Sequence, residues 1–578
     1  MFVMTYRSKK SFLVDPLIES VLLLKSQDFP TEMHYLNRLI LIFNTVRYLK
    51  PVQIYGRLWK KVWKPKPNLR PPPSLRPLRN TLITPCSRPN SYEGNNQFRF
   101  LNAPHKVEHP RDWNNASWSH LWIYNLHYFD FLRSDLSEQT GNHWIDRWIT
   151  ENQPGTSSGW DPYTSALRIV NWIYWDLAGN TLSSAAVESL ANQMRFLRKN
   201  LETHIQANHL LVDFKGIYFA STYFNSSEAN RLRAIAATGL IEEINKQFLP
   251  DGGHFELSPM YHGITTEDLI DVLSIQIAYP EVLECEVDAK LNSILRQRLP
   301  KILRWLSEMR HPDGDYVLFN DAARGIAPTP ESIIEFAQRC GVSPEAERET
   351  IAHNAHSGHV RILFEDLALF LDVGEVGASY QPGHAHADSL GFECSLFGSR
   401  FIVDSGTQEY ASGEIRNFQR STAAHNTVEV DQLSSSEVWG AFRVARRAQP
   451  DLVDVAESES KIQVTAAHDG YRQINGGPVH KRQWVVNEKR LMIIDTLEGK
   501  TVNAISRFHL HPDVESEVID NRSAKLTFGK RTIQFSCDHG NIELQETAYS
   551  PEFGISIANH VLAIHFSNPS LTQTFSWQ

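Results

Sequence analysis

The chain has 578 residues, of which 42% are hydrophobic and 21% are charged, and its net charge is −9. We expect more than one domain, because single hydrophobic cores stop growing at about 250–300 residues. The acidic balance argues against a nucleic-acid partner, and no run of the chain approaches the ~20 apolar residues that a membrane-spanning helix needs.

The N-terminal segment is basic and helical in pattern. Residues 1–20 lack the order of basic, apolar and small residues that marks a cleavable secretion signal, which favours a cytoplasmic protein. Residues 36–63 carry apolar positions at a spacing of three and four, which is typical of helices. We expect these helices to dock on the main body, and a helix lying on a membrane surface is the alternative. Recurring prolines in residues 64–80 exclude a helix and predict an extended strap.

From about residue 118 to 350 the pattern is almost wholly helical. Successive segments repeat apolar residues at a spacing of three and four, with polar capping residues before several of them. These segments are 162–179, 183–205, 227–249, 265–280 and 288–309. Consecutive amphipathic helices with short connections predict stacked helical hairpins or an α/α barrel.

After about residue 357 the apolar period changes to two, which predicts strands. Residues 360–374 and 480–499 are examples, and residues 484–494 form two apolar runs around a polar turn, as in a hairpin. Short strands at this spacing predict antiparallel sheets packed as a sandwich.

The sequence therefore predicts a multidomain α+β protein with three parts. Residues 1–117 would form basic helices and a proline-rich strap, residues 118–350 the helical domain, and residues 351–578 the β-sandwich. The chemistry-bearing residues lie in the second and third parts.

Two clusters of candidate catalytic residues lie in the helical part. Asn208 and His209 stand between two predicted helices. Two glycines and Pro259 are expected to break the helix and to present Glu256, Tyr261 and His262 on a loop, where catalytic groups are common. Each residue alone has an ordinary alternative, such as a helix cap, a core histidine or an interface aromatic.

A third cluster begins in "QPGHAHADSL", residues 381–390, between two predicted strands. On an extended chain His384, His386 and Asp388 would share one face. Three titratable groups are costly to bury together unless they bind something. A metal, a proton in transfer and one another are the alternatives.

Further along the chain, Asp404 and His425 add a carboxylate and an imidazole. With His386 they would make a ligand set suited to Zn²⁺, and a hydrogen-bonded polar cluster is the alternative. Arginines after Asp404 form a local basic stripe on an acidic protein, which favours an anionic ligand. These arginines are Arg416, Arg420, Arg443, Arg446 and Arg447, and the last three also fit a solvated strand face.

Taken together, the pattern resembles the heparinase II/III-like polysaccharide lyases over about residues 120–578. The resemblance depends most on "GHAHADSLGFECSLFGSRFIVDSG" and "IRNFQRSTAAHNTVEVD", and "QANHLL" and "ELSPMYH" occur in the matching order. Members join an α/α toroid, an incomplete helical barrel, to an antiparallel β-sandwich and include lyases of heparan sulfate and of alginate. The resemblance implies a periplasmic or secreted protein, in contrast to the N-terminal sequence.

Carried to this sequence, the resemblance implies catalytic roles. Asn208 would neutralise the substrate carboxylate, and His209 matches a histidine of the alginate-type members. Tyr261 matches the catalytic tyrosine and His384 the histidine across the cleft. Tyr410 is the match for a second active-site tyrosine.

The resemblance also implies a cofactor and substrate contacts. His386, Asp404 and His425 match the ligands of one structural divalent metal, which we expect to be Zn²⁺. The residues expected to contact the substrate are Tyr410, Arg416, Arg420 and Glu256.

The implied reaction is β-elimination on an acidic polysaccharide that contains uronic acid. A base removes the proton on C5, and the oxygen on C4 leaves. If both lie on one side of the ring, Tyr261 would be base and acid; otherwise His209 or His384 takes the proton while Tyr261 donates one.

Two other functions compete with a lyase. A glycoside hydrolase would use two carboxylates roughly 5–10 Å apart, for which Glu256 with Glu267 or Asp268 are the candidates. A non-catalytic glycan-binding or assembly protein of an exopolysaccharide or capsule pathway is the second alternative.

Overall fold

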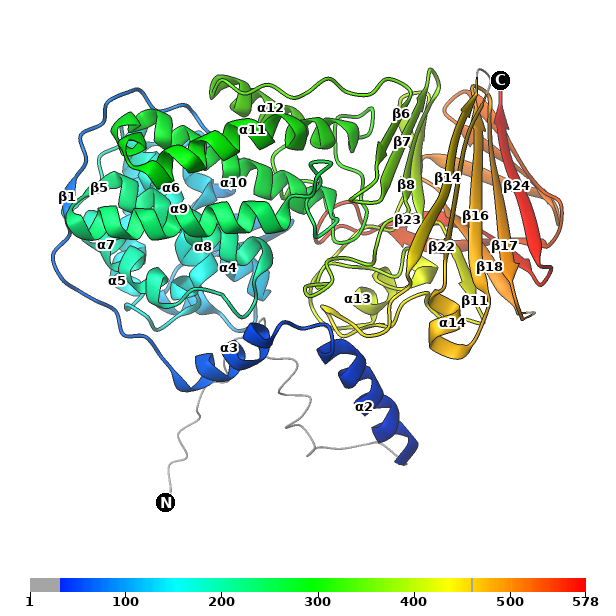
Figure 1. Ribbon diagram of the computed structural model, residues 1–578, viewed down its shortest axis with the longest axis horizontal. Coiled ribbons are helices and arrows are strands. Elements are labelled where there is room, and N and C mark those ends of the chain that lie inside the picture. Colours follow the sequence, from blue (N-terminus) through cyan, green and yellow to red (C-terminus); the bar gives the residue numbers. More distant parts are fainter. Residues whose placement is uncertain (1–31, 459–460, 501) are drawn as a thin grey trace.

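A computed structural model describes residues 32–458, 461–500 and 502–578. A helical domain and a β-domain lie side by side, and the chain passes once from the first to the second (Figure 1). This arrangement confirms the predicted fold class. The expectations for residues 1–31 lie outside the described residues.

The helical domain is an open, incomplete toroid built around α8. Helix α8 packs against α6, α7, α9 and α10. The helices are α4 (His120–Tyr128), α5 (Glu138–Glu151), α6 (Pro162–Leu177), α7 (Ser184–Lys199), α8 (Ala207–Tyr223), α9 (Ser227–Gln247), α10 (Pro259–Ala278), α11 (Glu286–Glu308) and α12 (Pro330–Arg339). Serine caps begin four of them, since each serine accepts a hydrogen bond from the third backbone N–H beyond it. These serines are Ser137, Ser183, Ser226 and Ser258.

Helix α10 begins six residues earlier than its apolar pattern predicts. Pro259 occupies the first turn, where its missing N–H is no loss, and Ser258 caps the helix by accepting a bond from the Tyr261 N–H. The predicted loop is therefore wrong for Tyr261 and His262, which lie in the first turn of α10. Asn208 and His209 likewise lie in the first turn of α8.

The β-domain consists of antiparallel sheets that enclose one hydrophobic core. The five-stranded sheet has the order β10 (Ser399–Ile402), β9 (Phe392–Leu396), β8 (Leu367–Asp372), β7 (His359–Phe364), β6 (Ile351–Asn354). The four-stranded sheet has the order β11 (Val428–Val430), β18 (Ala504–His509), β23 (Ile557–Phe566), β22 (Asn541–Tyr549). The eight-stranded sheet has the order β14 (Pro450–Ser458), β15 (Lys461–His468), β16 (Val479–Asn487), β17 (Arg490–Glu498), β24 (Ser570–Trp577), β21 (Arg531–Cys537), β20 (Ser523–Phe528), β19 (Val514–Asp520).

The predicted hairpin at 484–494 is confirmed. Strands β16 and β17 pair with Trp484 opposite Ile493, around the polar turn at Glu488 and Lys489. Trp484 is buried in the core that the sheets share. The two apolar runs around a polar turn therefore identified this pair of strands.

The segment 382–390 is not a strand, although its neighbours are. It forms turns, and the backbone N–H of Ala385 bonds to the carbonyl of Pro382 at 3.1 Å. Pro382 and Gly383 interrupt the strand pattern, because proline cannot donate to a ladder. The expectation that His384, His386 and Asp388 share a strand face is wrong for this reason.

The two domains share buried apolar contacts. Val403, Tyr549 and Phe553 of the β-domain belong to the hydrophobic cluster of the helical domain. Trp305 of α11 packs in a second cluster with Phe370 of β8. The boundary between the domains is thus packed, and the cavity described below has rigid walls.

The N-terminal helices α2 (Glu32–Val46) and α3 (Pro51–Val62) lie along one edge of the molecule (Figure 1). They contact both domains, because Lys60 Nζ bonds to Asn200 and Trp439 Nε1 donates to Thr45 Oγ1 at 3.1 Å. Residues 64–80 then form an extended strap as expected, and its Ser74–Leu75 pairs with Phe224–Asn225. None of the helices in the described ranges is long and apolar enough to cross a bilayer.

Candidate active site between the two domains

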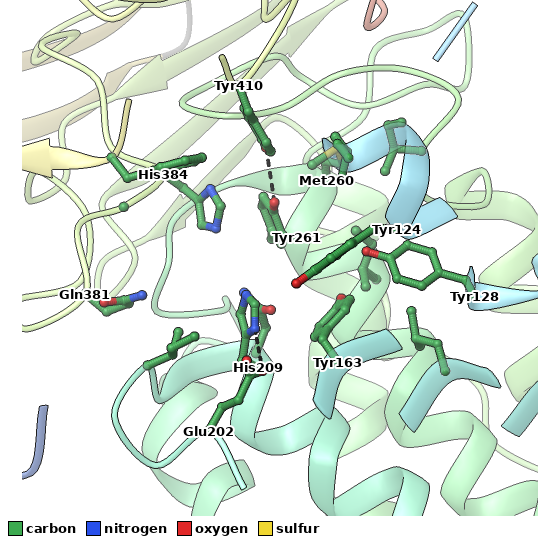
Figure 2. Close-up of a pocket in the computed structure, with 18 of the residues that line it drawn as sticks. Tyr124, Tyr128, Tyr163, Glu202, His209, Met260, Tyr261, Gln381, His384 and Tyr410 are labelled. Carbon is green, nitrogen blue, oxygen red and sulfur yellow. Dashed lines mark hydrogen bonds and ion pairs between the residues drawn. The ribbon is translucent and has the colours of Figure 1, made fainter. Parts of the chain in front are cut away.

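A cavity of about 290 Å³ lies where the helical domain meets the β-domain. Asn208, His209 and Tyr261 line it from the helical side, and His384 and Tyr410 from loops of the β-domain. Figure 2 shows His209, Tyr261, His384 and Tyr410 gathered around one space. The structure therefore brings together an amide, a phenol and imidazoles that lie up to 202 positions apart in the chain.

Asn208 is fixed by a buried carboxylate. Its Nδ2 donates to Glu256 Oε1 at 3.0 Å and to Oε2 at 2.8 Å, and both side chains are buried. Glu256 lies behind Asn208 and does not line the cavity. The expected substrate contact of Glu256 is thus replaced by a positioning contact to the amide.

The backbone is strained beside Asn208 and beside Glu256. Gln206 and Ala207 have φ values of 71° and 56°, and Leu257 has a φ of 59°. Residues other than glycine rarely adopt this left-handed region, at a cost of about 1–3 kcal/mol each, and such strain clusters at functional sites. Here it turns the chain sharply into α8 just before Asn208 and His209.

His209 forms a dyad with Glu202. Its Nδ1 lies 2.8 Å from Glu202 Oε2, and its second ring nitrogen is directed to the cavity (Figure 2). Burial by itself lowers the pKa of His209, but the charge of Glu202 and the hydrogen bond to it outweigh burial, so the pKa is raised. A carboxylate that holds one ring nitrogen leaves the other to accept or deliver a proton.

Tyr261 contacts both residues of the opposite wall. Its hydroxyl lies 3.1 Å from the Tyr410 hydroxyl, and its ring stacks on His384 with centroids 3.9 Å apart. Burial raises the pKa of Tyr261 well above its usual value, and the neighbouring Tyr410 raises it further. Tyr261 is therefore a protonated phenol at rest, which suits a proton donor.

Asp321 is the buried centre of the opposite wall. His384 Nδ1 lies 3.0 Å from its Oδ2, and His386 Nε2 lies 2.8 Å from its Oδ1. Arg416 makes a two-pronged ion pair with the same carboxylate. Burial alone would raise the pKa of Asp321, but the charge of Arg416 and the histidine bonds hold it well below its usual range.

Nothing in the sequence pointed to Asp321 as part of this wall. It lies 63 positions before His384 and 95 before Arg416, in a loop with no recognisable spacing. Its one local signal is a polar pair, since Asn320 precedes it with a φ of 57° and accepts the backbone N–H of His386.

The two arginines expected to bind substrate lie outside the cavity. Arg416 is buried against Asp321, and Arg420 donates to the backbone carbonyls of Ala385 and Gly440. A buried guanidinium with all its bonds inside the protein positions loops and does not meet a ligand. The expectation for Arg416 and Arg420 is corrected accordingly.

Other cations do line the cavity. Arg88, Arg133 and Lys215 belong to its wall, where they are paired with acidic residues such as Glu267 and Asp268. Arg57 and Arg443 also line the cavity, and burial together with the positive charges of Arg38 and Arg57 lowers the pKa of Arg443 to about 10. Cations held this close to one another favour an anionic ligand.

A possible metal site lies behind His384. Among the described residues, His386, Asp388 and His425 offer ligand atoms that lie within 4.8 Å of one another. Each keeps one buried polar atom without a partner, namely His386 Nδ1, Asp388 Oδ2 and His425 Nε2. Two imidazoles and a carboxylate with orphaned atoms that converge fit a Zn²⁺ ion.

Asp404 lies behind His425, on the side away from the converging ligand atoms. Its Oδ2 lies 2.6 Å from His425 Nδ1, so it orients the imidazole, as carboxylates beside metal-binding histidines do. The group of converging ligand atoms thus contains Asp388, whereas the sequence favoured Asp404, because the turn at 382–390 directs Asp388 toward the two histidines.

Comparisons with known proteins cover most of the chain. Residues 176–337 match the family model "Heparinase II/III N-terminus", and residues 346–578 match "Heparinase II/III-like, C-terminal". A heparin-sulfate lyase of Bacteroides stercoris is 25% identical over 60% of this chain and 51% of its own length. An FtsZ-localized protein C of Caulobacter vibrioides is 24% identical over 56% of each chain. This chain spans about half the length of these curated relatives.

The fold also resembles a solved structure. The crystal structure of a heparan sulfate lyase mutant from Pedobacter heparinus superposes with a TM-score of 0.58 over 83% of this chain and 81% of that one. At 17% identity this likeness concerns the fold.

Proposed function

This chain belongs to the heparinase II/III-like family, and on that premise we propose that it is a polysaccharide lyase acting on uronic acid by β-elimination. The observation that carries the proposal is the meeting of Asn208, His209, Tyr261 and His384 in one cavity between the domains. These residues supply the hydrogen-bond donor, the base and the acid that elimination requires.

The substrate class that we propose is a glycosaminoglycan or a similar acidic polysaccharide. The names of the heparin-sulfate lyases among the relatives support this class. Arg57 and Arg443 would meet the anionic groups of the polymer, since both line the cavity. They take over the role that the sequence assigned to Arg416 and Arg420.

The first step is neutralisation of the C6 carboxylate. Asn208 would exchange one of its two Nδ2–H bonds to Glu256 for the substrate carboxylate, which spreads the charge that develops when the C5 proton leaves. A preorganised donor of this kind typically contributes about 3–4 kcal/mol to catalysis.

In the second step His209 takes the C5 proton and Tyr261 protonates the C4 oxygen. His209 is the better base, because Glu202 stabilises the imidazolium that forms. Tyr261 is the better acid, because burial keeps its phenol protonated. The C5–H and C4–O bonds break and the C4–C5 double bond forms, so this assignment requires the C5 proton and the C4 oxygen to lie on opposite faces of the sugar ring, one toward His209 and the other toward Tyr261.

His386, Asp388 and His425 would hold one divalent ion, which we expect to be Zn²⁺. The ion would join the turn at 382–390 to the neighbouring loop and so support His384, with no part in activating water. Asp404 and Asp321 would orient the two imidazoles from the far side.

A hydrolase is less well supported. Glu267 and Asp268 line the cavity, but Arg88, Arg133 and Lys215 form ion pairs with them. Carboxylates neutralised in this way are poor candidates for the acid and base of a glycosidase.

The test uses the purified full chain and a panel of acidic polysaccharides, with and without uronic acid. We expect new ultraviolet absorbance from an unsaturated uronate, and only with uronate polymers. New reducing ends without that absorbance would indicate a hydrolase. Binding without either product would indicate a non-catalytic protein and would contradict the proposal.

A further inference from the structure

Helix α3 packs onto the protein through its polar side. Gln53 and Gly56 are its buried residues, and Lys60 reaches inward to Asn200. A Cβ atom at Gly56 would lie 2.9 Å from the Cβ of His204, so the helix approaches the body closely on this side. An amphipathic helix of a globular protein normally buries its apolar side instead.

The apolar side of α3 faces outward, and α2, which precedes it in the chain, also exposes apolar residues. We call this surface the α2–α3 apolar face. Its residues, with their exposed fractions, are Leu39 (63%), Phe43 (68%), Ile54 (44%), Tyr55 (61%), Leu58 (54%), Trp59 (60%), Val62 (83%) and Trp63 (51%). The two tryptophan rings stack with centroids 5.8 Å apart. Exposed apolar surface gathered in one place marks an interaction site.

The segment that carries this face has charged residues of one sign. From residue 33 to residue 92 the chain has no aspartate or glutamate, although the whole chain carries a net charge of −9. Lys61, Lys64 and Lys66 flank Trp63, and Arg38 and Arg47 belong to α2 and its C-terminal end. An apolar face with tryptophan, bordered by lysine and arginine, is the composition of helices that lie in the interface of an anionic bilayer.

A second copy of the chain is a poor occupant of the same face. Two-fold dimers place one patch against itself, which would bring basic border against basic border. Like charges facing each other across an interface cost several kcal/mol. An anionic surface has no such penalty.

We propose that the α2–α3 apolar face docks this protein on an anionic lipid surface. Trp59, Trp63 and Leu58 would enter the boundary between headgroups and acyl chains, and the lysines would pair with lipid phosphates. Thr45, Leu49 and Arg57 of the same segment line the cavity, so docking would hold the cavity about one helix diameter, ~10 Å, from the headgroups. The proposal does not depend on the lyase activity.

The test is flotation of the full chain with phosphatidylcholine vesicles that do or do not contain phosphatidylglycerol. We expect binding to the anionic vesicles that weakens as salt is added. The double variant Leu58→Ser, Trp59→Ser should bind the anionic vesicles at least tenfold more weakly than the unmodified chain, at low salt and at high salt. Lys61→Glu with Lys64→Glu should remove the preference for anionic vesicles.

The matched control is Val518→Ser with Ile519→Ser, which removes two exposed apolar side chains from β19, the last strand of the eight-stranded sheet. This variant should bind vesicles as the unmodified chain does. The proposal would be overturned if the control and test variants lose vesicle binding equally, or if the full chain does not float with the vesicles. The face would be assigned to a second copy instead if the full chain does not bind vesicles and light scattering shows that it is a dimer. In that case Leu58→Ser with Trp59→Ser should dissociate the dimer.

Discussion

The two walls of the cavity hold their functional groups by different means. On the helical wall Asn208, His209 and Tyr261 lie in the first turns of α8 and α10, where the backbone of a long helix fixes them. On the opposite wall His384 and Tyr410 lie on irregular loops. Buried charged side chains hold these loops in place, and hydrogen bonds between paired strands do not.

This difference separates the expected effects of mutations. A helix keeps its first turn when one side chain on it changes, so changes on the helical wall should affect chemistry much more than stability. A loop organised around Asp321 and Arg416 depends on those side chains for its conformation, so changes there should affect stability and activity together.

The largest effect is expected for Asp321→Asn. The change leaves the buried Arg416 without its counter-charge, which should lower the free energy of unfolding by about 3–5 kcal/mol. Activity should fall with it, because His384 loses its partner. Denaturant unfolding with parallel assays measures both, and Asp366→Asn, which breaks an exposed pair with Lys489, is the matched control. Unchanged stability in Asp321→Asn would show that the loops do not depend on this charge.

Tyr261→Phe tests the helical wall. Loss of the proton donor should lower kcat/KM by about 10²–10⁴, while stability should change by no more than about 1 kcal/mol, the contribution of one hydrogen bond. Thermal unfolding and product absorbance measure the two effects. Activity retained within a few-fold would remove Tyr261 from the proposed mechanism.

Asp404→Asn tests the proposed metal site at the back of the loop wall. Because Asp404 orients His425 and does not itself offer a ligand, metal affinity should fall about 10–100-fold and not vanish. Elemental analysis and chelator competition on the purified protein measure it, with the exposed Asp513→Asn as control. A purified, active protein without metal would contradict the site.

The smallest effect is a shift in pH dependence. The raised pKa of His209 means that the Glu202–His209 pair stabilises the fold fully below pH 6.5, and that this stability is lost as pH rises through the folded pKa. As a base His209 must be neutral, so kcat/KM should rise about tenfold per pH unit below that pKa and then level off. Stability and activity should therefore change in opposite directions over one pH range above 6.5.

Glu202→Gln should move the midpoint of that activity profile to lower pH, because the carboxylate that raises the pKa is gone. Profiles of kcat/KM and of Tm against pH measure both trends. A midpoint that does not move would assign the base to another group, with His384 the next candidate.

Residues near one another in the chain were the predictable part of this protein. The helical and alternating periods gave the two domains and the 484–494 hairpin, because each period reflects burial within one element. The motifs also led to Asn208, His209, Tyr261 and His384, which the structure places in one cavity.

Tertiary structure alone decided which polar groups meet in the interior. Asp321 pairs with partners 63 and 95 positions away, so no local pattern could reveal it. Arg416 looked like a substrate contact because sequence shows its charge but not its burial. Likewise the apolar side of α3 reads as a core face, and only packing shows that it points outward. Periodicity records which residues share a face, whereas the partner of that face is set by contacts between distant segments.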